Sequence, residues 1–331
     1  MQTTRLQRRR RLFQLGFFAL FLLAPALNLL RFDLHESQLW VLGQRWSLGI
    51  GELIAGRASA AETARTMLLR GFLPALVLVA GFLAVAWRWG RLYCGWLCPH
   101  FSMVELINGL LQRAAARLSL WDRERTPRAD GRGPDARWWP AFAAACVIGG
   151  FVWSITLLSY LLPPAEVWSG LLHASMTPGP ARFLFIAWAV FALEFAFARH
   201  LFCRFGCAVG LFQSLAWMAN PKAMVVSFER PRARDCRDCT PAPGSACDAA
   251  CPMRLRPREI KRRMFSCVQC GQCLQACEHS QAAQQRAPLL QWQVGADALR
   301  ETLRQRGSIT LGTARAVPPE AGCADRAAEA G

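Results

Sequence analysis

The sequence predicts a mostly helical membrane protein that also carries a small α+β domain rich in cysteine. The first observation is that apolar residues make up 53% of the 331-residue chain and gather in four long stretches with almost no charge. The second is that eight of the 14 cysteines lie between Cys236 and Cys277. Cysteine packed so densely into one part of a long chain indicates metal ligation in a reducing compartment rather than a disulfide framework.

Four apolar stretches have the composition of membrane-crossing helices, which need about 20 residues to cross the hydrocarbon core. They are residues 12–30, 72–87, 138–162 and 183–198, of which the last contains Glu194. The stretch 39–56 is also apolar but is broken by glycines, so we predict a packed or re-entrant hairpin there rather than a span. Together these segments form the first predicted domain, residues 1–220, an α-helical membrane domain with four transmembrane helices.

Basic residues predict how the chain crosses the membrane, because cytoplasmic loops are enriched in Lys and Arg. Arginines cluster ahead of the first stretch and between the second and third, whereas residues 154–181 contain no Lys or Arg. We therefore expect a multi-pass protein of the bacterial cytoplasmic (inner) membrane with both termini in the cytoplasm. The net charge of +17 then fits an anionic membrane surface, and we expect no nucleic-acid partner.

One short motif occurs twice in the chain. RLYCGWLC at residues 91–98 is echoed by HLFCRFGC at residues 200–207, and each follows an apolar stretch. The repetition predicts two helical hairpins that each end in a Cys-x3-Cys motif at the cytoplasmic membrane edge. Cysteines at i and i+4 lie on one helical face, and two such pairs can complete a four-thiolate site. The candidate ligands are Cys94, Cys98, Cys203 and Cys207.

The expected occupant of this membrane-edge site is copper, as Cu(I), or a further iron–sulfur cluster, because thiolate ligands select these. The alternative is that the four small cysteines only pack helix ends. His100 and His200 are either additional ligands or interfacial residues. Cys146 and Cys323 have no partner at a metal-ligand spacing, and we expect no cofactor role for either.

The densest cysteine segment has the ligand spacing of an iron–sulfur protein. Its second half, Cys267-x2-Cys270-x2-Cys273-x3-Cys277, has the spacing of bacterial two-cluster ferredoxins. Its first half, Cys236-x2-Cys239-x7-Cys247-x3-Cys251-Pro252, keeps the terminal x3-Cys-Pro of that pattern. In such ferredoxins the fourth cysteine of a run ligates the other cluster. This rule assigns Cys236, Cys239, Cys247 and Cys277 to a first 4Fe–4S cluster, and Cys267, Cys270, Cys273 and Cys251 to a second.

A pair of zinc sites is the alternative, since Cys-x2-Cys pairs also bind zinc. The x2-x2-x3 register and the Cys-Pro favour clusters. We therefore predict a cytoplasmic, ferredoxin-like α+β domain over residues 221–290, followed by a polar, partly disordered tail over 291–331. LLQWQVG predicts a strand, ADALRETLRQR predicts a short helix, and the composition from Thr313 onwards is typical of disorder.

With these motifs the chain resembles the membrane polyferredoxins of the cytochrome c oxidase accessory protein type (CcoG/RdxA/FixG). The resemblance covers about residues 31–278 and rests on RFDL, YCGWLCP, CRFGCAVGLFQS, VVSFERPR and the cysteine block. Proteins of that type usually continue into a further membrane helix and an immunoglobulin-like periplasmic domain, and this chain ends before them. The same superfamily contains NapH-like and NosR-like proteins.

The resemblance implies an oxidoreductase or electron-transfer component at the membrane. For the accessory-protein branch it implies reduction of Cu(II) to Cu(I) for assembly of a cbb3-type oxidase. Its partners would then be a redox protein or quinol and the oxidase assembly factors. The alternative is a NapH-like, quinol-linked relay subunit of a respiratory reductase, which does no chemistry on copper. A third hypothesis, in which metal only stabilises the fold, requires clusters without reversible reduction. No catalytic residue is assigned.

Overall fold

The computed structural model describes residues 2–123, 125–126, 131–239 and 246–312. These residues fold into two compact units. The first unit comprises the described residues of Met1–Leu15, Val85–Phe142 and Phe197–Gly331, and the second comprises Gly16–Ala84 and Ala143–Ala196. Cys323 and the tail from Thr313, whose composition indicates disorder, lie outside the described residues, as does most of the insertion after Cys239. The domain boundaries after residues 220 and 290 stay a prediction.

Three helical segments of the described chain are long and apolar enough to cross a membrane. They are Ala60–Trp89, Ala136–Leu161 and Pro178–Ala198, which contain most or all of the predicted stretches that begin at residues 72, 138 and 183. Their components are α3 (Ala60–Met67), a π-turn (Leu68–Phe72) and α4 (Leu73–Trp89); a 3-10 turn (Ala136–Trp138) and α7 (Trp139–Leu161); and α9 (Pro178–Leu193) with a π-turn (Glu194–Ala198).

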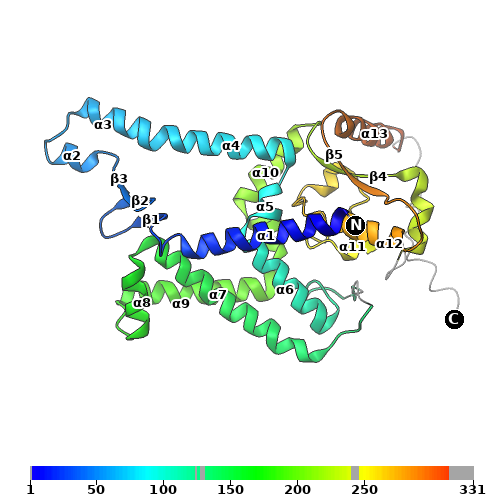
Figure 1. The fold of residues 1–331 in the computed structure, drawn as a ribbon, viewed down its shortest axis with the longest axis horizontal. Helices are drawn as coiled ribbons and strands as arrows, with labels where there is room; N and C mark the ends of the chain where they lie inside the picture. Colours follow the sequence, from blue (N-terminus) through cyan, green and yellow to red (C-terminus); the bar gives the residue numbers. More distant parts are fainter. Residues whose placement is uncertain (1, 124, 127–130, 240–245, 313–331) are drawn as a thin grey trace. The chain divides into compact units, whose positions relative to one another are not determined.

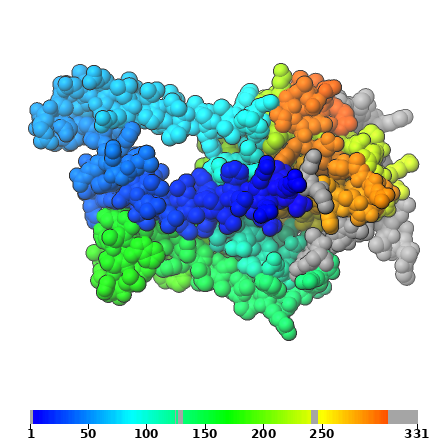
Figure 2. Space-filling model, in the orientation of Figure 1, coloured from blue at the N-terminus to red at the C-terminus, as the bar shows by residue number. Residues whose placement is uncertain are grey.

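The side chains of the first of these segments are open to the surroundings. Within its most apolar window no residue is buried, and Leu76 and Leu78 are 65% and 74% exposed. Figure 2 shows this segment in light blue and cyan, with its side chains on the surface in view. Apolar side chains exposed along a whole helix fit contact with lipid, in which burial from water is supplied by the membrane.

The predicted span at residues 12–30 is not helical throughout. Helix α1 (Gln2–Leu23) begins earlier than predicted and ends before Pro25. Proline disfavours a helical residue before it and cannot donate a backbone hydrogen bond, so the helix stops there. Asn28 then adopts a positive φ of 52°. The helix includes the arginine run at its start, so only its second half is uncharged, and the count of four spans is not confirmed.

The apolar stretch at 39–56 forms β-structure and a short helix, where we predicted a packed or re-entrant hairpin. Strands β1 (Leu30–Asp33), β2 (Gln38–Val41) and β3 (Gln44–Trp46) form an antiparallel sheet in that order. Leu42 and Gly43 join β2 to β3 with φ values of 50° and 76°. Positive φ at both positions is typical of the type I′ turn that matches strand twist. The second unit also contains α2 (Ile50–Ile54) and α8 (Pro164–Leu172).

The first unit combines helices with a two-stranded sheet. Strands β4 (Val225–Phe228) and β5 (Leu290–Gln293) pair antiparallel and lie side by side in Figure 1. The strand predicted in LLQWQVG is therefore confirmed, and so is the helix predicted in ADALRETLRQR, although that helix continues to Gly312. The other helices of the unit are α5 (Leu92–Trp96), α6 (Pro99–Ala115), α10 (Ala208–Ala219), α11 (Ala246–Ala249), α12 (Gln272–Ala282) and α13 (Ala296–Gly312). Shorter turns are the π-turn Phe202–Gly206 and the 3-10 turns Arg230–Asp238 and Lys261–Met264.

Candidate functional site

Four cysteines from the two halves of the cysteine block line one cavity in the first unit. They are Cys251, Cys267, Cys270 and Cys273. The rest of the lining is mainly apolar and includes Met253, Leu255, Met264, Val268 and Trp292. The structure thus places Cys251, which precedes the others by at least 16 positions, beside the three cysteines of the second run. This is the grouping that the cross-over rule assigns to the second cluster.

The loop that carries Cys267 and Cys270 is tightly curled. Gln269 and Gly271 have φ values of 52° and 70°, and an ideal Cβ on Gly271 would lie 2.9 Å from the Trp292 ring. A positive φ together with this close approach requires glycine at position 271. Helix α12 starts directly after Gly271. The curl therefore sets Cys267 and Cys270 in the loop and Cys273 in the first turn of the helix, so that all three face one cavity.

The remaining four cysteines of the block pack in a second apolar cluster. Cys236, Cys239, Cys247 and Cys277 lie there with Leu274, Leu289 and Leu290, and Cys273 belongs to the same cluster. Cys236 and Cys239 are hydrogen-bonded to each other, and the charge of a Cys277 thiolate contributes to the raised pKa of Cys247. The second grouping is the one assigned to the first cluster. The chain between Cys239 and Ala246 is not among the described residues.

Burial controls the protonation of these thiols. It raises the pKa of Cys267 to about 12 and raises the pKa of Cys251 further, mainly because a thiolate loses its hydration there. The thiols of Cys251 and Cys267 are therefore protonated until a metal replaces the proton. Two sulfurs also accept backbone hydrogen bonds: Leu255 N–H donates to Cys251 Sγ and Leu289 N–H to Cys277 Sγ, both over 3.3 Å. Such bonds stabilise anionic sulfur and tune cluster potentials.

The membrane-edge cysteines lie at two equivalent local positions. Cys94 is in α5 and Cys203 is in the π-turn Phe202–Gly206, and both are buried. Cys98 and Cys207 each precede a helix, α6 and α10 respectively, in extended conformations with ψ of 117° and 106°. The expectation that each pair shares one helical face was wrong, because the backbone leaves the helix between the two cysteines. The two-hairpin repeat as a whole stays a prediction.

The four sulfurs of these motifs are not arranged around a single point as the ligands of one metal ion would be. Cys94, Cys98 and Cys207 interact electrostatically with one another, and Cys203 Sγ lies 3.6 Å from Nδ1 of His100. Burial, and next the neighbouring Cys94, raise the pKa of Cys98 to about 12. His100 therefore lies beside Cys203, one of the candidate metal ligands. The other histidine of the motifs, His200, is buried at 1% exposure, and burial lowers its pKa to about 4, so it is neutral.

The first membrane-edge motif packs directly on the loop of the second cysteine run. An ideal Cβ on Gly95 would lie 2.1 Å from the carbonyl oxygen of Val268. Trp96 Nε1 donates to the carbonyl of Gln269 over 3.0 Å, and Gln7 Nε2 donates to that of Cys270 over 2.8 Å. Cys94, Cys203, Cys251 and Cys270 consequently share one apolar cluster. The first membrane-edge motif and the second cysteine run, separated by more than 150 residues in sequence, are therefore neighbours in the first unit.

Two buried arginines support this packing, and sequence reasoning missed both. Arg10 is fully buried, donates from Nε to the carbonyl of Gly95 over 2.8 Å and pairs with Glu105. Arg91 is 2% exposed and lies against Cys94 and Cys203. In the sequence Arg10 is one of several arginines that indicate orientation, and Arg91 is only the basic residue that opens the motif. The one sequence signal for these roles was that both copies of the motif open with a basic residue.

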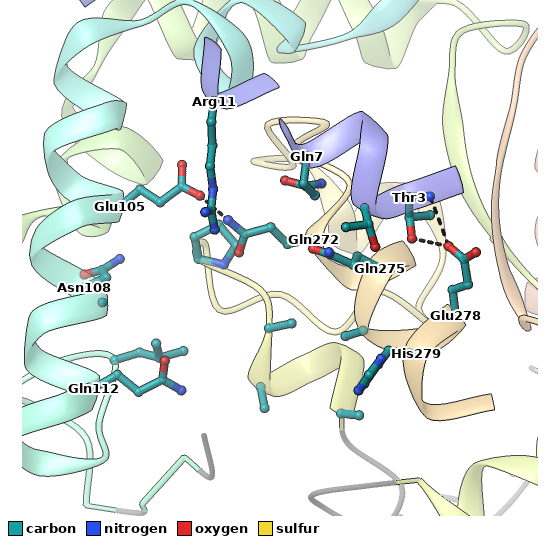
Figure 3. A pocket seen from close by; sticks show the side chains of 18 of the residues that line it. Thr3, Gln7, Arg11, Glu105, Asn108, Gln112, Gln272, Gln275, Glu278 and His279 are labelled. Carbon is teal, nitrogen blue, oxygen red and sulfur yellow. Dashed lines mark hydrogen bonds between the residues drawn. The ribbon is translucent and has the colours of Figure 1, made fainter. Parts of the chain in front are cut away.

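A larger cavity of about 810 Å³ lies beside the cysteine block, between the start of α1, α6, α11 and α12. Figure 3 shows amide and carboxylate side chains around it. Several of these groups bond to each other across its wall: Gln272 donates to Glu105, and Thr3 donates to Glu278. The cavity contains no cysteine in its lining. It is a feature of the unit separate from both cysteine groupings.

The chemistry of the donors fits iron–sulfur clusters. Among the described residues, no three His, Cys, Asp or Glu side chains are placed to share a single metal ion. A four-iron cluster makes a different demand, since four cysteines ligate it together. Cys251, Cys267, Cys270 and Cys273 meet that demand with four thiols around one apolar cavity. When bound, such a cluster supplies one-electron transfer.

Comparison with known proteins places an iron–sulfur signature on the chain. Residues 72–116 match the family described as 4Fe–4S binding domain. This chain carries an iron–sulfur binding segment. The matched residues contain Cys94 and Cys98 and no other cysteine, so the match falls on the first membrane-edge motif rather than on the ferredoxin-like block. The match supports an iron–sulfur cofactor, and it does not fix the number of clusters.

Two curated proteins are similar to the chain over part of their length. One is YccM of Escherichia coli (strain K12), whose name describes a candidate electron transport protein, with 23% identity over 63% of this chain and 56% of YccM. The other is the uncharacterized protein MJ0749 of Methanocaldococcus jannaschii, with 22% identity over 61% of this chain and 65% of that protein. The chain thus spans about three fifths of these relatives. No solved structure matches it.

Proposed function

We propose that this chain is a membrane-bound electron-transfer protein that holds two 4Fe–4S clusters. Cys236, Cys239, Cys247 and Cys277 ligate the first cluster, and Cys251, Cys267, Cys270 and Cys273 ligate the second. The observation that carries the proposal is the cavity shared by Cys251 and the three cysteines of the second run. Cys251 comes from the other half of the block, as the ferredoxin pattern requires. The similarity to YccM, named for electron transport, supports the same role.

The test is the metal content and redox behaviour of the full chain, purified anaerobically in detergent. We expect iron and sulfide for two four-iron clusters, a brown colour, and reversible signals in electron paramagnetic resonance. Cys277→Ser and Cys267→Ser are expected to weaken different signals, because their cysteines belong to different clusters. Cys146→Ser serves as the control, since Cys146 lies in the second unit. Colourless protein that contains zinc in place of iron and sulfide would contradict the proposal.

The membrane-edge cysteines are the proposed acceptor site, and Cu(II) is the proposed substrate. Cys94, Cys98, Cys203 and Cys207 would bind the ion and favour its reduced state, because thiolates select Cu(I). One electron from the ferredoxin-like block converts one Cu(II) to Cu(I). The packing of Gly95 and Trp96 on the loop of the second cysteine run supports a short route for that electron. In this arrangement the sulfurs close onto the ion when it binds. The partners would be cbb3-type oxidase assembly factors.

Substitution of the membrane-edge cysteines tests the copper step separately from the clusters. We expect Cys94→Ser and Cys203→Ser to abolish reduction of Cu(II) by the dithionite-reduced protein while both cluster signals persist. Persistent reduction would contradict the site assignment. Titration with a quinol provides the other arm: clusters reduced by quinol, in a protein that leaves Cu(II) untouched, would favour the quinol-linked relay.

We also propose that both termini face the cytoplasm. The distribution of arginine supports this orientation, which requires an even number of crossings and therefore α1 as a fourth crossing beside the three apolar segments. The test introduces single cysteines near each end of a chain whose clusters are intact. Their labelling by an impermeant maleimide is then compared between inverted and right-side-out vesicles. Labelling of either terminus in right-side-out vesicles would contradict the proposed orientation.

A further inference from the structure

Arg91 is a buried cation without a carboxylate partner among the described residues. Its side chain is 2% exposed, and its Nε has no hydrogen-bond partner. A charge removed from water is costly unless an opposite charge or strong hydrogen bonds compensate it. One hydrogen bond, from Nη2 to the carbonyl of Cys203 over 2.8 Å, is partial compensation. The remaining compensation must come from other groups beside the guanidinium.

The groups beside Arg91 are sulfurs of two different cysteine sites. Nη2 lies 3.9 Å from Cys94 Sγ, in the first membrane-edge motif. Cys94 in turn shares one apolar cluster with Cys251 and Cys270 of the ferredoxin-like block, and Cys267 packs against the same cluster. Thiols become anionic when they ligate metal. Arg91 therefore lies close to the thiolates that would carry negative charge in both sites once metal is bound.

The surrounding backbone leaves room for this guanidinium and holds it in place. An ideal Cβ on Gly210 would lie 2.2 Å from Nη2 of Arg91 and 2.8 Å from its Cζ. A side chain at position 210 would thus displace the guanidinium. Gly210 belongs to α10, which follows the second motif, so both copies of the repeat contribute to the position of the arginine.

The second copy of the motif supplies no matching cation. His200 occupies the position that corresponds to Arg91, and it is buried and neutral. The exposed Arg204 of that motif lies over the Phe205 ring. Among the residues at these two repeat positions, the buried positive charge therefore comes from the first copy alone.

We propose that Arg91 is the shared counter-cation of the membrane-edge cysteines and of the cluster ligated by Cys267. The inference rests on the proposed function, in which that cluster accepts and releases one electron. Reduction adds a negative charge to the cluster, and a nearby cation in a buried site stabilises the reduced form. Arg91 thus raises the reduction potential of this cluster and acts as a positioning residue at the contact between the two sites.

The test is a redox titration of the full chain in detergent, followed by electron paramagnetic resonance. In Arg91→Gln we expect the ratio of reduced to oxidised cluster, at the wild-type midpoint, to fall by about tenfold, which is a shift of about 59 mV for one electron. Arg91→Lys keeps the charge and is expected to recover most of the shift. Arg204→Gln removes an exposed charge next to Cys203 and is the matched control, with the wild-type potential expected.

Gly210→Ala provides an independent variant in which the arginine is present but displaced. We expect a shift of the same sign as in Arg91→Gln and of smaller size. If Arg91→Gln loses iron, Gly210→Ala decides: a lowered potential supports the proposal, and the wild-type potential overturns it. Wild-type potentials in an iron-replete Arg91→Gln protein also overturn it. Wild-type protein without reversible cluster signals contradicts the proposed function itself, and this inference with it.

Discussion

Gly95 shows how one residue can determine whether two sites meet. The atom that any other side chain would add there falls 2.1 Å from a backbone oxygen of Val268. A backbone oxygen cannot swing away as the end of a side chain can, so the whole loop would have to move. That loop carries Cys267 and Cys270. The absence of a side chain at position 95 therefore permits the membrane-edge motif to pack on the ferredoxin-like block.

We predict that Gly95→Ala destabilises the first unit by about 1–3 kcal/mol, the usual cost of overpacking a close contact. Thermal unfolding of the detergent-purified protein, followed by the visible absorption of the clusters, would measure it. The matched control is Gly109→Ala in α6, where a Cβ meets nothing within 4 Å. That change should leave stability equal or slightly higher, because alanine favours helix over glycine by about 0.5–1 kcal/mol. Equal midpoints for both variants would refute the argument.

The buried pair of Arg10 and Glu105 gives a second prediction at the residue scale. Their side chains are 1% and 23% exposed. Glu105→Leu leaves the buried guanidinium unpaired, so we expect a loss of about 3 kcal/mol in the free energy of unfolding. The exposed pair of Arg45 and Glu36 is the control, because Glu36→Leu should cost less than about 1 kcal/mol. Denaturant midpoints would compare the two variants, and similar losses would contradict the assignment.

Helices α6 and α10 each have a membrane-edge cysteine at the N-cap position. The sulfur of Cys207 accepts a hydrogen bond from Gly210 N–H over 3.4 Å, whereas the side chain of Cys98 makes no cap hydrogen bond to α6. Each sulfur thus lies at a helix start, where unpaired N–H groups favour a negative charge. A thiolate that ligates metal would gain from the same position, so at Cys207 the cap and the proposed ligand are one group.

We predict that Cys207→Ser and Cys207→Ala separate these two roles. Serine oxygen caps helices well, so Cys207→Ser should keep thermal stability close to the wild type, whereas Cys207→Ala should lose about 0.5–2 kcal/mol. Both variants should lose the proposed copper binding, because neither supplies a thiolate. Circular dichroism and metal analysis would report the two effects. Equal stability of the two variants would show that the sulfur does not cap α10.

The elements that the sequence predicted are those whose signal is local. The segments LLQWQVG and ADALRETLRQR predicted the strand at β5 and the helix α13, and lack of charge predicted three of the long apolar helices. The start of α1 was missed because its arginines were interpreted only as an orientation signal ahead of the first apolar stretch, and its end was missed because the stretch continues past Pro25. Arg10 belongs in the helix because it bonds to the carbonyl of Gly95, 85 positions away. Contacts of that range leave no periodic trace in a single sequence.

The cysteine spacing is the local signal that predicted a contact between distant parts of the chain. It grouped Cys251 with the second run before any coordinates, since a known ligand pattern encodes that tertiary contact. The contact of Gly95 with Val268 and the position of Arg91 had no such pattern behind them. They depend on which faces of distant segments meet, and neither composition nor period determines that.

At the scale of the whole molecule, the chemistry is confined to one of the two compact units. Among the described residues, Cys146 is the one cysteine in the second unit, and the other twelve lie in the first. The second unit instead holds most of the exposed apolar helix Ala60–Trp89 and most of α7. Cofactor binding should therefore stabilise the two units unequally, because a ligand stabilises only the structure that binds it.

We predict that removal of iron loosens the first unit and leaves the second unchanged. The proposed clusters bind only the folded arrangement of the eight cysteines. Loss of the clusters leaves buried thiols without a ligand and removes binding energy from that unit alone. Hydrogen exchange of the iron-free protein, prepared anaerobically with a chelator and a mild oxidant, should rise several-fold in peptides from α12, β4 and β5. Peptides from α7 after Ala143 are the internal control and should keep their exchange rate. Equal increases in both sets would mean that the clusters do not stabilise the first unit selectively, and the assignment of the eight cysteines as ligands would lose its thermodynamic basis.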